Sequence, residues 1–294
     1  MKNLLYLLIF SIVILGCNKD DDDQDENPSS DLVNADYASY TISAWGTSGA
    51  DDFAGMVDDG NGIMFFTGAS EPDGYQGNIV LVKTNLSSTS VEWAKSFDLS
   101  DRDYYPSPSE NCHSQGGGGS RCIDMDNSGN VYIAGTSKQG FNEAFVSKVN
   151  TSGTVEWQQS WEGDDSGLAR GAAKAYALDE KDGKVYVTGS TGAGQSGEEA
   201  MIFLLVLDGN TGDVDTNTVV GFDPSDGYND RGYVVRLAAD NSIYLAGWEG
   251  QNNSGFLMKL ASDYSLQWFE RIDLGVGGRI TDIEFDSSGN LYLA

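Results

Sequence analysis

The chain has 294 residues, of which 17 are Lys or Arg, 45 are Asp or Glu and one is His, so its formal net charge is −28. A chain this acidic repels the phosphates of DNA and RNA, which argues against nucleic acid as a partner, whereas calcium, cationic partners and neutral ligands stay compatible with it. One His and three Cys leave little material for a transition-metal centre or a His-based catalytic site. The 37 Gly and five Pro suit many short strands joined by tight turns.

The first sixteen residues have the pattern of a targeting signal. A short basic start at residues 1–3 precedes an apolar run at residues 4–15, which is too short to span a bilayer comfortably. The sequence Ile-Leu-Gly-Cys at residues 14–17 then resembles the lipobox of bacterial lipoproteins. That resemblance implies a signal peptide over residues 1–16, removed before Cys17, and lipidation of Cys17, with several acyl chains anchoring the protein in a membrane. An ordinary secretory signal with an incidental Cys is the alternative.

An acidic block follows directly, with Asp at residues 20–23 and further acidic side chains at Asp25 and Glu26. Like charges at this density cannot collapse around a core, so residues 17–36 are predicted to be a disordered tether. Lys19 followed by acidic residues also resembles the surface-export signal of Bacteroidetes lipoproteins. That resemblance implies an outer-membrane protein exposed at the cell surface. A spacer that faces the periplasm is the alternative.

From residue 37 onward the chain repeats one cassette of short strands. Its clearest copy is residues 124–135 (DMDNSGNVYIAG), in which turn residues precede a short run of apolar and β-branched side chains that suits a buried strand. Variants return at residues 59–68, 182–189, 240–247 and 286–294. The Gly after the second strand of each cassette is predicted to end that strand.

In chain order the pattern predicts an isolated strand and then rounds of four strands. The predicted strands are 37–46; 53–57, 63–67, 78–85 and 90–97; 122–126, 130–135, 144–150 and 154–161; 171–178, 184–189, 200–207 and 215–222; 233–238, 242–247, 255–260 and 266–272; and 279–285, which begins a fifth round. Four-stranded antiparallel units that repeat at this scale are typical of the blades of a β-propeller. A pair of β-sandwich sheets is the alternative, but it would not repeat the turn and the outer strands in step.

A family resemblance supports the propeller. The segment DNSGNVYIAGTS…AFVSKVNTSGTVEWQQSW resembles the bacterial β-propeller repeats called SBBP and the similar delta-60 repeats. A Lys recurs on the third strand and a Trp on the fourth, at Lys83, Lys148 and Lys259 and at Trp93, Trp157 and Trp268. The third round departs from this pattern, because Val206 replaces the Lys and no Trp follows. The resemblance covers roughly residues 40–294, and it implies a scaffold of surface and secreted proteins without implying a reaction.

The fifth round stops at Ala294, where each earlier round continues to a third strand. About four and a half blades would leave an unpaired sheet edge. The predicted strand at residues 37–46 resembles a lone fourth strand of the kind that completes the last blade of a propeller. We therefore expect residues 37–294 to form an all-β propeller that is incomplete at its C-terminus, in a sequence that is truncated relative to the natural protein.

Two cysteines remain once Cys17 is used for the lipid, and an oxidising compartment favours their pairing. The loop between Cys112 and Cys122 includes four consecutive Gly residues, which allow the two Cα atoms to come within disulfide range. We therefore predict a disulfide between them. The alternative is a nucleophile or metal pair made by Cys112 and His113, but adjacent residues seldom converge on one point.

Candidate ligand sites come from the loops and turns. Asp124, Asp126 and Ser128 begin like a calcium-binding loop, but Gly135 stands where the bidentate Glu belongs, which favours a plain hairpin turn. The loops that share one face of a propeller, where ligands usually bind, carry aromatic and acidic side chains that can stack on sugars or accept hydroxyl groups. These candidates are Tyr75, Tyr104, Tyr105, Phe141, Tyr228, Trp248, Asp52 and Asp165. The alternative is that they only shape turns and cover blade edges.

The sequence favours a lipid-anchored binding or adhesion module at the cell surface, without enzymatic activity. Carbohydrate is the ligand suggested by analogy, and a surface protein is the other candidate partner. No cofactor is expected, with calcium as the alternative. Two alternatives stay open. One is a propeller-fold polysaccharide lyase or glycosidase that uses two loop carboxylates, and the other is a structural protein of the cell envelope.

Overall fold

The structure is a computed structural model that describes residues 50–71, 78–87, 90–97, 121–138, 142–163, 173–191, 200–220, 229–275 and 277–294. The chain divides into two compact units, Met1–Ile42 and Ser43–Ala294, and every described residue belongs to the second. The predicted signal peptide, the tether and the isolated strand at residues 37–46 lie outside the described residues.

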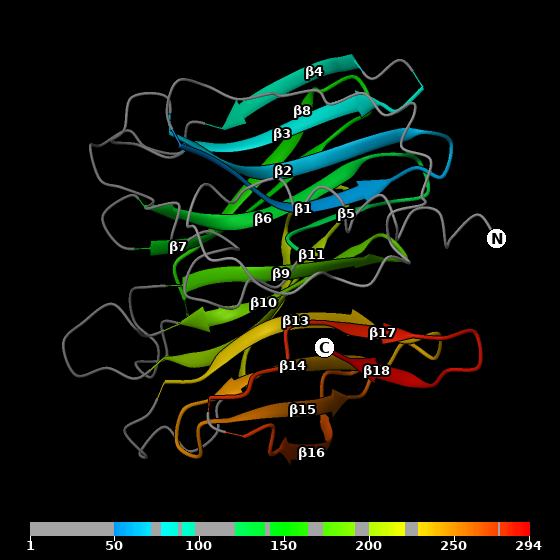
Figure 1. The fold of residues 1–294 in the computed structure, drawn as a ribbon. Coiled ribbons are helices and arrows are strands. Elements are labelled where there is room, and N and C mark those ends of the chain that lie inside the picture. Colours follow the sequence, from blue (N-terminus) through cyan, green and yellow to red (C-terminus); the bar gives the residue numbers. More distant parts are fainter. Residues whose placement is uncertain are drawn as a thin grey trace, which may run out of the picture. The chain divides into compact units, whose positions relative to one another are not determined.

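The described residues form four four-stranded antiparallel sheets and one two-stranded sheet, and the strands of each sheet are consecutive in the chain (Figure 1). Blade 1 contains β1 (Ala50–Asp58), β2 (Ile63–Glu71), β3 (Asn78–Asn85) and β4 (Ser90–Phe97); blade 2 contains β5 (Ile123–Met125), β6 (Val131–Lys138), β7 (Asn142–Val149) and β8 (Val155–Trp161); blade 3 contains β9 (Ala173–Lys181), β10 (Lys184–Thr191), β11 (Met201–Asp208) and β12 (Val214–Val220); blade 4 contains β13 (Arg231–Leu237), β14 (Ile243–Glu249), β15 (Ser254–Leu260) and β16 (Leu266–Ile272); and a half-blade contains β17 (Ile283–Phe285) and β18 (Leu291–Leu293).

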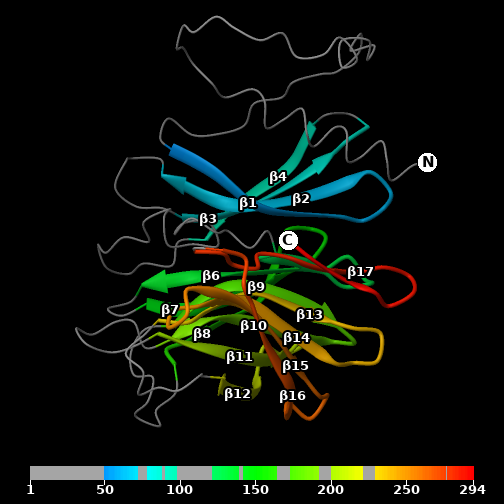
Figure 2. The ribbon, with the colours of Figure 1, turned by 60° about the horizontal axis from the view of Figure 1, so that its bottom comes forward.

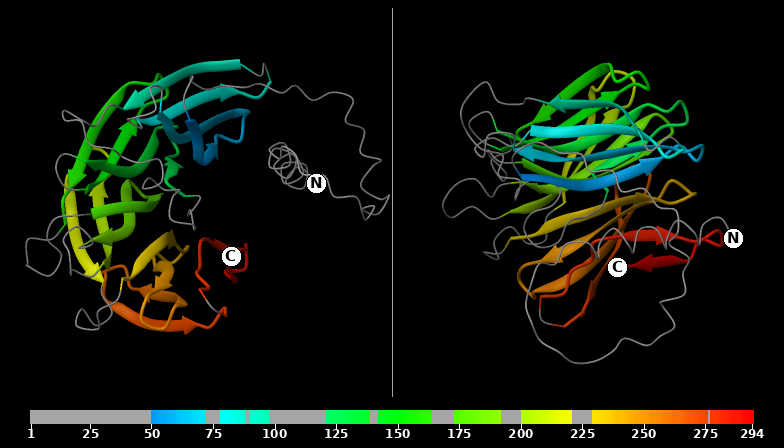
Figure 3. Two further views of the ribbon diagram at one scale, coloured as in Figure 1. Left: turned by 60° about the vertical axis from the view of Figure 1, so that its left-hand side comes forward. Right: turned by 45° about the horizontal axis from the view of Figure 1, so that its top comes forward.

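These sheets are the blades of a β-propeller, so the predicted fold class is confirmed. Within the second unit the sheets follow one another in chain order around an arc (Figures 2 and 3). The first strands of consecutive blades contact one another, which places β1, β5, β9, β13 and β17 on the inner side of the arc. The strands β3, β4 and β16 begin and end at the residues that the sequence predicts.

The expectation that a Gly ends each second strand is wrong. Gly189 lies inside β10, where it pairs with Phe203 on one side and with Ala175 on the other. A Cβ atom on Gly189 would lie 1.8 Å from the carbonyl oxygen of Lys174. The bulged first strand therefore approaches so closely that only Gly fits, and the strand continues to Thr191.

The hydrophobic core is divided into layers between adjacent blades. Between blades 2 and 3, for example, Tyr132 and Trp161 pack in one cluster with Leu178 and Phe203. Comparable clusters fill the other three seams, between blades 1 and 2, between blades 3 and 4, and between blade 4 and the half-blade. A blade has two apolar faces and buries them only against its neighbours, so each blade depends on the next one for its stability.

A tryptophan on the fourth strand ties a blade to a Gly of the next blade. A Cβ atom on Gly153 would lie 3.2 Å from the ring of Trp93, and one on Gly212 would lie 2.7 Å from the ring of Trp157. Trp157 Nε1 also donates a hydrogen bond of 3.1 Å to the carbonyl oxygen of Gly209. Both Gly residues have a positive φ in the turn between the third and fourth strands, so their hairpins leave the space that the indole occupies.

The third blade, which lacks the Trp, reverses this arrangement. Thr216 takes the place of the Trp in register with Val206, and Tyr264 stands in the turn of the next blade with a φ of 69°. Tyr264 packs with Tyr186 in the cluster between blades 3 and 4, and its hydroxyl group hydrogen-bonds to Lys184. Where blade 3 has no Trp, a large side chain of this seam therefore comes from the turn of blade 4.

Charged groups on the first strands join the blades near the inner side of the arc. The carboxylate of Asp124 accepts a hydrogen bond of 2.7 Å from the backbone N–H of Glu180 on the next blade. Asp179 repeats this contact one blade further on, where it accepts a 2.8 Å bond from the N–H of Leu237 and forms a salt bridge with Arg236. Side-chain carboxylates thus satisfy backbone donors across the seams.

Two arginines complete this network, and both have carboxylate partners. Arg236 also pairs with Glu284 of the half-blade, at 3.3 Å. Arg121, just before β5, binds Asp282 through Nε at 2.7 Å and also pairs with Glu284. Burial raises the pKa of Asp179 to about 6, because desolvation outweighs the opposing charge of Arg236 and the nearby Asp124 adds to the rise.

We predict that Trp157→Ala lowers the free energy of unfolding by about 3 kcal/mol, because it empties the space between two blades. Trp268→Ala should cost about 1 kcal/mol or less, because Trp268 occupies the same position on blade 4 but is 38% exposed. Chemical denaturation followed by circular dichroism measures both values. Equal losses in the two variants would show that the seam contact with the Gly hairpin does not carry this stability.

We also predict that Asp179 makes the protein less stable as the pH rises from about 4 to 6. The folded chain holds this proton up to a pH of about 6, whereas the unfolded chain releases it near the ordinary value of 3.8, so ionisation favours unfolding. At neutral pH the ionisation of Asp179 lowers the free energy of unfolding by about 3 kcal/mol. Asp179→Asn should therefore reduce the loss of stability between pH 4 and pH 7, whatever its effect at a single pH.

Denaturation midpoints of the wild type and the Asp179→Asn variant across this pH range provide the measurement. Asp263→Asn is the matched control, because the pKa of Asp263 is lowered by its hydrogen bonds to Ser265 and its contribution has the opposite sign. A pH dependence that is the same in the wild type and in Asp179→Asn would contradict the prediction.

Candidate functional site

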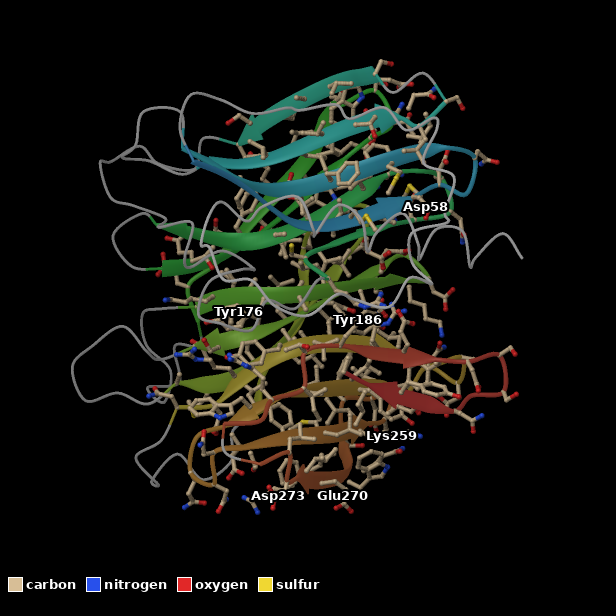
Figure 4. All side chains as sticks on the ribbon, in the orientation of Figure 1. Asp58, Tyr176, Tyr186, Lys259, Glu270 and Asp273 are labelled. Carbon is tan, nitrogen blue, oxygen red and sulfur yellow. The ribbon has the colours of Figure 1, made fainter. Side chains whose placement is uncertain are left out.

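Each blade has two ends that differ in their connections. At the first, the hairpin end, tight turns join the first strand to the second and the third strand to the fourth. At the other, the loop end, the second strand ends and the third begins. Figure 4 labels Tyr176 and Tyr186, which lie toward opposite ends of blade 3, with Tyr186 toward the hairpin end.

The hairpin end is built from aspartate turns, and the predicted calcium residues belong to one of them. Asp126 accepts hydrogen bonds from the N–H groups of Ser128 and Asn130, each at 2.9 Å, and from the amide of Asn130. These bonds outweigh burial, which by itself would raise the pKa of Asp126, and they hold that pKa below its ordinary value. Asp240 and Asp286 close the corresponding turns of later blades in the same way.

Asp124 does not point toward the same position as Asp126, because its carboxylate binds the backbone of Met125 and that of Glu180 on the next blade. The turn therefore joins β5 to β6 as the hairpin that the sequence favours. In the part of the chain that the structure describes, no group of three or more His, Cys, Asp or Glu side chains could hold a metal ion.

The structure describes only some of the predicted ligand residues. Trp248 is described in full, whereas for Asp52 the structure describes only the backbone, in β1. The remaining candidates lie outside the described residues, namely Tyr75, Tyr104, Tyr105, Phe141, Tyr228 and Asp165. The same is true of Cys17 and Cys112. Cys122 is buried, but its predicted partner Cys112 is not described, so the disulfide stays a prediction.

Trp248 lies at the loop end of blade 4, near the end of β14, and it is partly exposed. Its indole Nε1 donates a hydrogen bond of 3.0 Å to the side-chain oxygen of Asn253. Arg231 faces it across the ladder between β13 and β14, and the guanidinium carbon lies 5.9 Å from the centroid of the indole ring. The ring is thus held on two sides while part of it remains accessible to solvent.

A buried carboxylate fixes the loop that follows Trp248. Glu249 is fully buried, and it accepts hydrogen bonds from Arg271 at 2.7 and 3.0 Å and from the Asn252 amide at 3.0 Å. Burial by itself would raise the pKa of Glu249, but these bonds outweigh it and hold the pKa below its ordinary value. Asp230 adds a 3.0 Å bond, which its carboxylate accepts from the N–H of Gly250. Trp248 therefore lies on a pre-organised support.

Two tyrosines extend the site toward blade 3. Tyr176 and Tyr233 are the extra residues at the bulges of β9 and β13, and their rings lie 5.7 Å apart across the seam. A bulge re-aims the side chain that it carries and is common beside functional sites. The hydroxyl of Tyr176 lies 3.1 Å from Ser190 Oγ, and the hydroxyl of Tyr233 hydrogen-bonds to the guanidinium of Arg231.

These contacts form a continuous group that we call the seam site, made of Tyr176, Ser190, Arg231, Tyr233 and Trp248. Its partly exposed groups are the indole of Trp248, the guanidinium of Arg231 and the hydroxyl of Tyr176, which can stack on a ring and exchange hydrogen bonds with a polar ligand. Ser190 and Tyr233 are buried and support these groups. Of these residues the sequence pointed only to Trp248, because the ligand site was expected in the loops and not on the first strands. One signal was present, since Tyr176 and Tyr233 precede the apolar half of the first strand in successive cassettes.

A pair of glutamates lies at the loop end of blade 2, but it does not join the seam site. Burial and the nearby Glu162 raise the pKa of Glu143, which is itself hydrogen-bonded to Ser160 on the neighbouring strand. Both groups belong to the outer strands of their blade, away from the first strands that carry the tyrosines.

Among the described residues, no helix is long and apolar enough to cross a membrane.

Comparisons with known proteins support the fold and leave the function open. No family model matches the chain, and no curated protein is significantly similar to it. A protein of unknown function from Dyadobacter fermentans is similar in structure, with a TM-score of 0.55 and 13% identity over 83% of this chain and 74% of that one. An exo-beta-1,3-galactanase from Clostridium thermocellum reaches a TM-score of 0.46 with 14% identity over 80% of this chain and 52% of that one. A putative oxidoreductase (glucose dehydrogenase) from Thermus thermophilus reaches 0.46 with 13% identity over 87% and 80%. At 13% identity the similarity to the Dyadobacter protein shows a shared fold and nothing about function.

Proposed function

We propose that this protein is a lipid-anchored propeller of the cell surface that binds carbohydrate at the seam site. The observation that carries the proposal is the partly exposed indole of Trp248, which is held by Asn253 and Arg231 on a pre-organised loop. Carbohydrate-binding sites commonly use an immobilised aromatic ring for stacking and hydroxyl or charged groups for orientation. Tyr176, which is partly exposed on the neighbouring blade, supplies such a hydroxyl group, and the buried Ser190 orients it.

The location of the seam site agrees with what a binding module requires. The site lies across two blades at the loop end, so its side chains are positioned by strands and not by long loops. Sites that are carried by rigid elements lose less conformational entropy when a ligand binds. A ligand that spans both blades would therefore meet groups whose spacing is already fixed by the sheets.

The proposed address depends on the N-terminal sequence. Cys17 ends a lipobox-like segment, and the acidic residues after it resemble a surface-export signal of Bacteroidetes lipoproteins. A protein anchored by several acyl chains stays on the membrane, and a charged tether would hold the propeller away from the bilayer. We include in this proposal that the blades are repeats of the SBBP kind.

We predict that Cys17→Ala moves the protein from the membrane fraction to the soluble fraction and abolishes incorporation of labelled palmitate, because the acylated thiol is lost. Cys112→Ala is the matched control and should leave both unchanged. Digestion of the wild-type protein by a protease added to intact cells tests surface exposure. Membrane retention of the Cys17→Ala variant would rule out the lipid anchor.

We predict that Trp248→Ala weakens carbohydrate binding about 30-fold or more, because the loss of a central aromatic contact costs about 2 kcal/mol. A glycan array identifies the ligands, and isothermal titration calorimetry measures their affinities for the wild type and the variant. Trp268→Ala is the control, since it removes an exposed Trp from the outer strand of the same blade.

Two outcomes would redirect this proposal. If the array ligands are cleaved, as shown by new reducing ends or unsaturated products, the glycosidase or lyase alternative is favoured. If no glycan binds to the wild type, the structural role in the envelope is favoured and the carbohydrate proposal is wrong.

A further inference from the structure

Arg231 differs from the other arginines whose contacts the structure describes. Arg121, Arg236 and Arg271 each bind at least one carboxylate, through salt bridges to Asp282, Asp179 and Glu249. Among the described residues, no carboxylate forms a salt bridge with Arg231. The neighbouring carboxylate of Asp230 is directed to the backbone of Gly250 instead. In a chain with a net charge of −28, a half-buried cation that has no acidic partner among the described residues is unusual.

The surroundings of Arg231 keep it charged and oriented. Its hydrogen bond to the Tyr233 hydroxyl and the nearby Tyr176 outweigh the effect of burial, so the pKa of Arg231 lies above its ordinary value. On its other side it lies over the indole of Trp248, where a guanidinium is attracted to the π-system. A guanidinium keeps five N–H donors in a planar fork, and one hydroxyl cannot use all of them.

We propose that the ligand of the seam site is an acidic sugar whose carboxylate binds Arg231, and this inference rests on the carbohydrate-binding function proposed above. The planar fork of a guanidinium matches a carboxylate with two parallel hydrogen bonds. A carboxylate bound there brings its pyranose ring next to the indole of Trp248. The partly exposed hydroxyl of Tyr176 then lies on the blade 3 side of the site, where it can bond to a sugar hydroxyl, while the buried Ser190 holds it in place.

The acidic character of the chain does not prevent an acidic sugar from binding to Arg231. Charges that are further away than about 8 Å are largely screened at physiological ionic strength, so the local guanidinium governs the interaction. The two carboxylates beside the site, Asp230 and Glu249, are only 4% and 0% exposed and are engaged in hydrogen bonds. They therefore do not present free negative charge to the ligand.

The test compares two oligosaccharide series of the same length, oligogalacturonates and neutral oligogalactosides, by titration calorimetry with the full chain. The wild type should bind the acidic series at least about tenfold more tightly, and this preference should shrink as salt is added. Arg231→Gln should weaken binding of the acidic series about 10- to 100-fold and change the neutral series less than about threefold. Arg231→Lys should bind the acidic series with an affinity between those of the wild type and Arg231→Gln, because Lys keeps the charge but lacks the planar fork of donors.

Lys95→Gln is the matched control, because it makes the same change of charge on β4 of blade 1 and should leave both series unchanged. Circular dichroism of the variants confirms that they are folded. Equal binding of both series by the wild type, or unchanged binding of the acidic series by Arg231→Gln, would overturn the inference while the carbohydrate-binding proposal stands. Failure of the wild type to bind any oligosaccharide of either series would overturn both.

Discussion

The packing of one blade against the next is the constraint on which the rest of this structure depends. A four-stranded blade has apolar side chains on both faces, and the four core clusters all lie in seams between consecutive sheets. Each seam needs a large group on one side and a small one on the other. Trp157 against Gly212 is one solution, and in the seam between blades 3 and 4 the large group is Tyr264 from the turn of the next blade, which packs with Tyr186. The complementarity is therefore a property of each pair of blades and not of a single fixed position in the cassette.

The polar groups follow the same seams. The Lys residues of the third strands lie over the aromatic rings of the second strands, with Lys148 5.6 Å from the Tyr132 ring and Lys259 5.3 Å from the Tyr244 ring. Carboxylates on first strands reach the backbone N–H groups of the next blade, as Asp179 does with Leu237. A chain with a large excess of acidic residues thus uses several of its carboxylates as hydrogen-bond acceptors. These bonds stabilise the charged carboxylates in the folded protein.

The seam site is a consequence of this architecture. Two bulges on adjacent first strands direct Tyr176 and Tyr233 toward each other, and the register of the next hairpin sets Arg231 opposite Trp248. The bulges are possible because Gly189 and Gly247 allow the first strand to approach closely. Arg231 and Arg236 lie at opposite ends of β13: Arg236 binds the carboxylate of Asp179, whereas Arg231, at the loop end, is held by a hydroxyl and an aromatic ring. That difference separates the groups that stabilise the fold from the groups that are available to a ligand.

Local chemistry let the sequence alone determine most of the strands. Turns rich in Asp, Asn and Gly, followed by short apolar runs, predict β3, β4 and β16 to the residue, because a hairpin depends on neighbours in the chain. The sequence also identified Trp248 as a candidate for binding. Only the tertiary structure showed that Gly189 lies within its strand, that Asp124 binds the next blade, and that Arg231 and the two tyrosines join Trp248. Such contacts connect distant parts of the chain, as Asp124 does with Glu180 across 56 positions. They are decided by the packing of blades and by bulges, and the Tyr that recurs before the apolar half of two first strands does not by itself show which groups it meets.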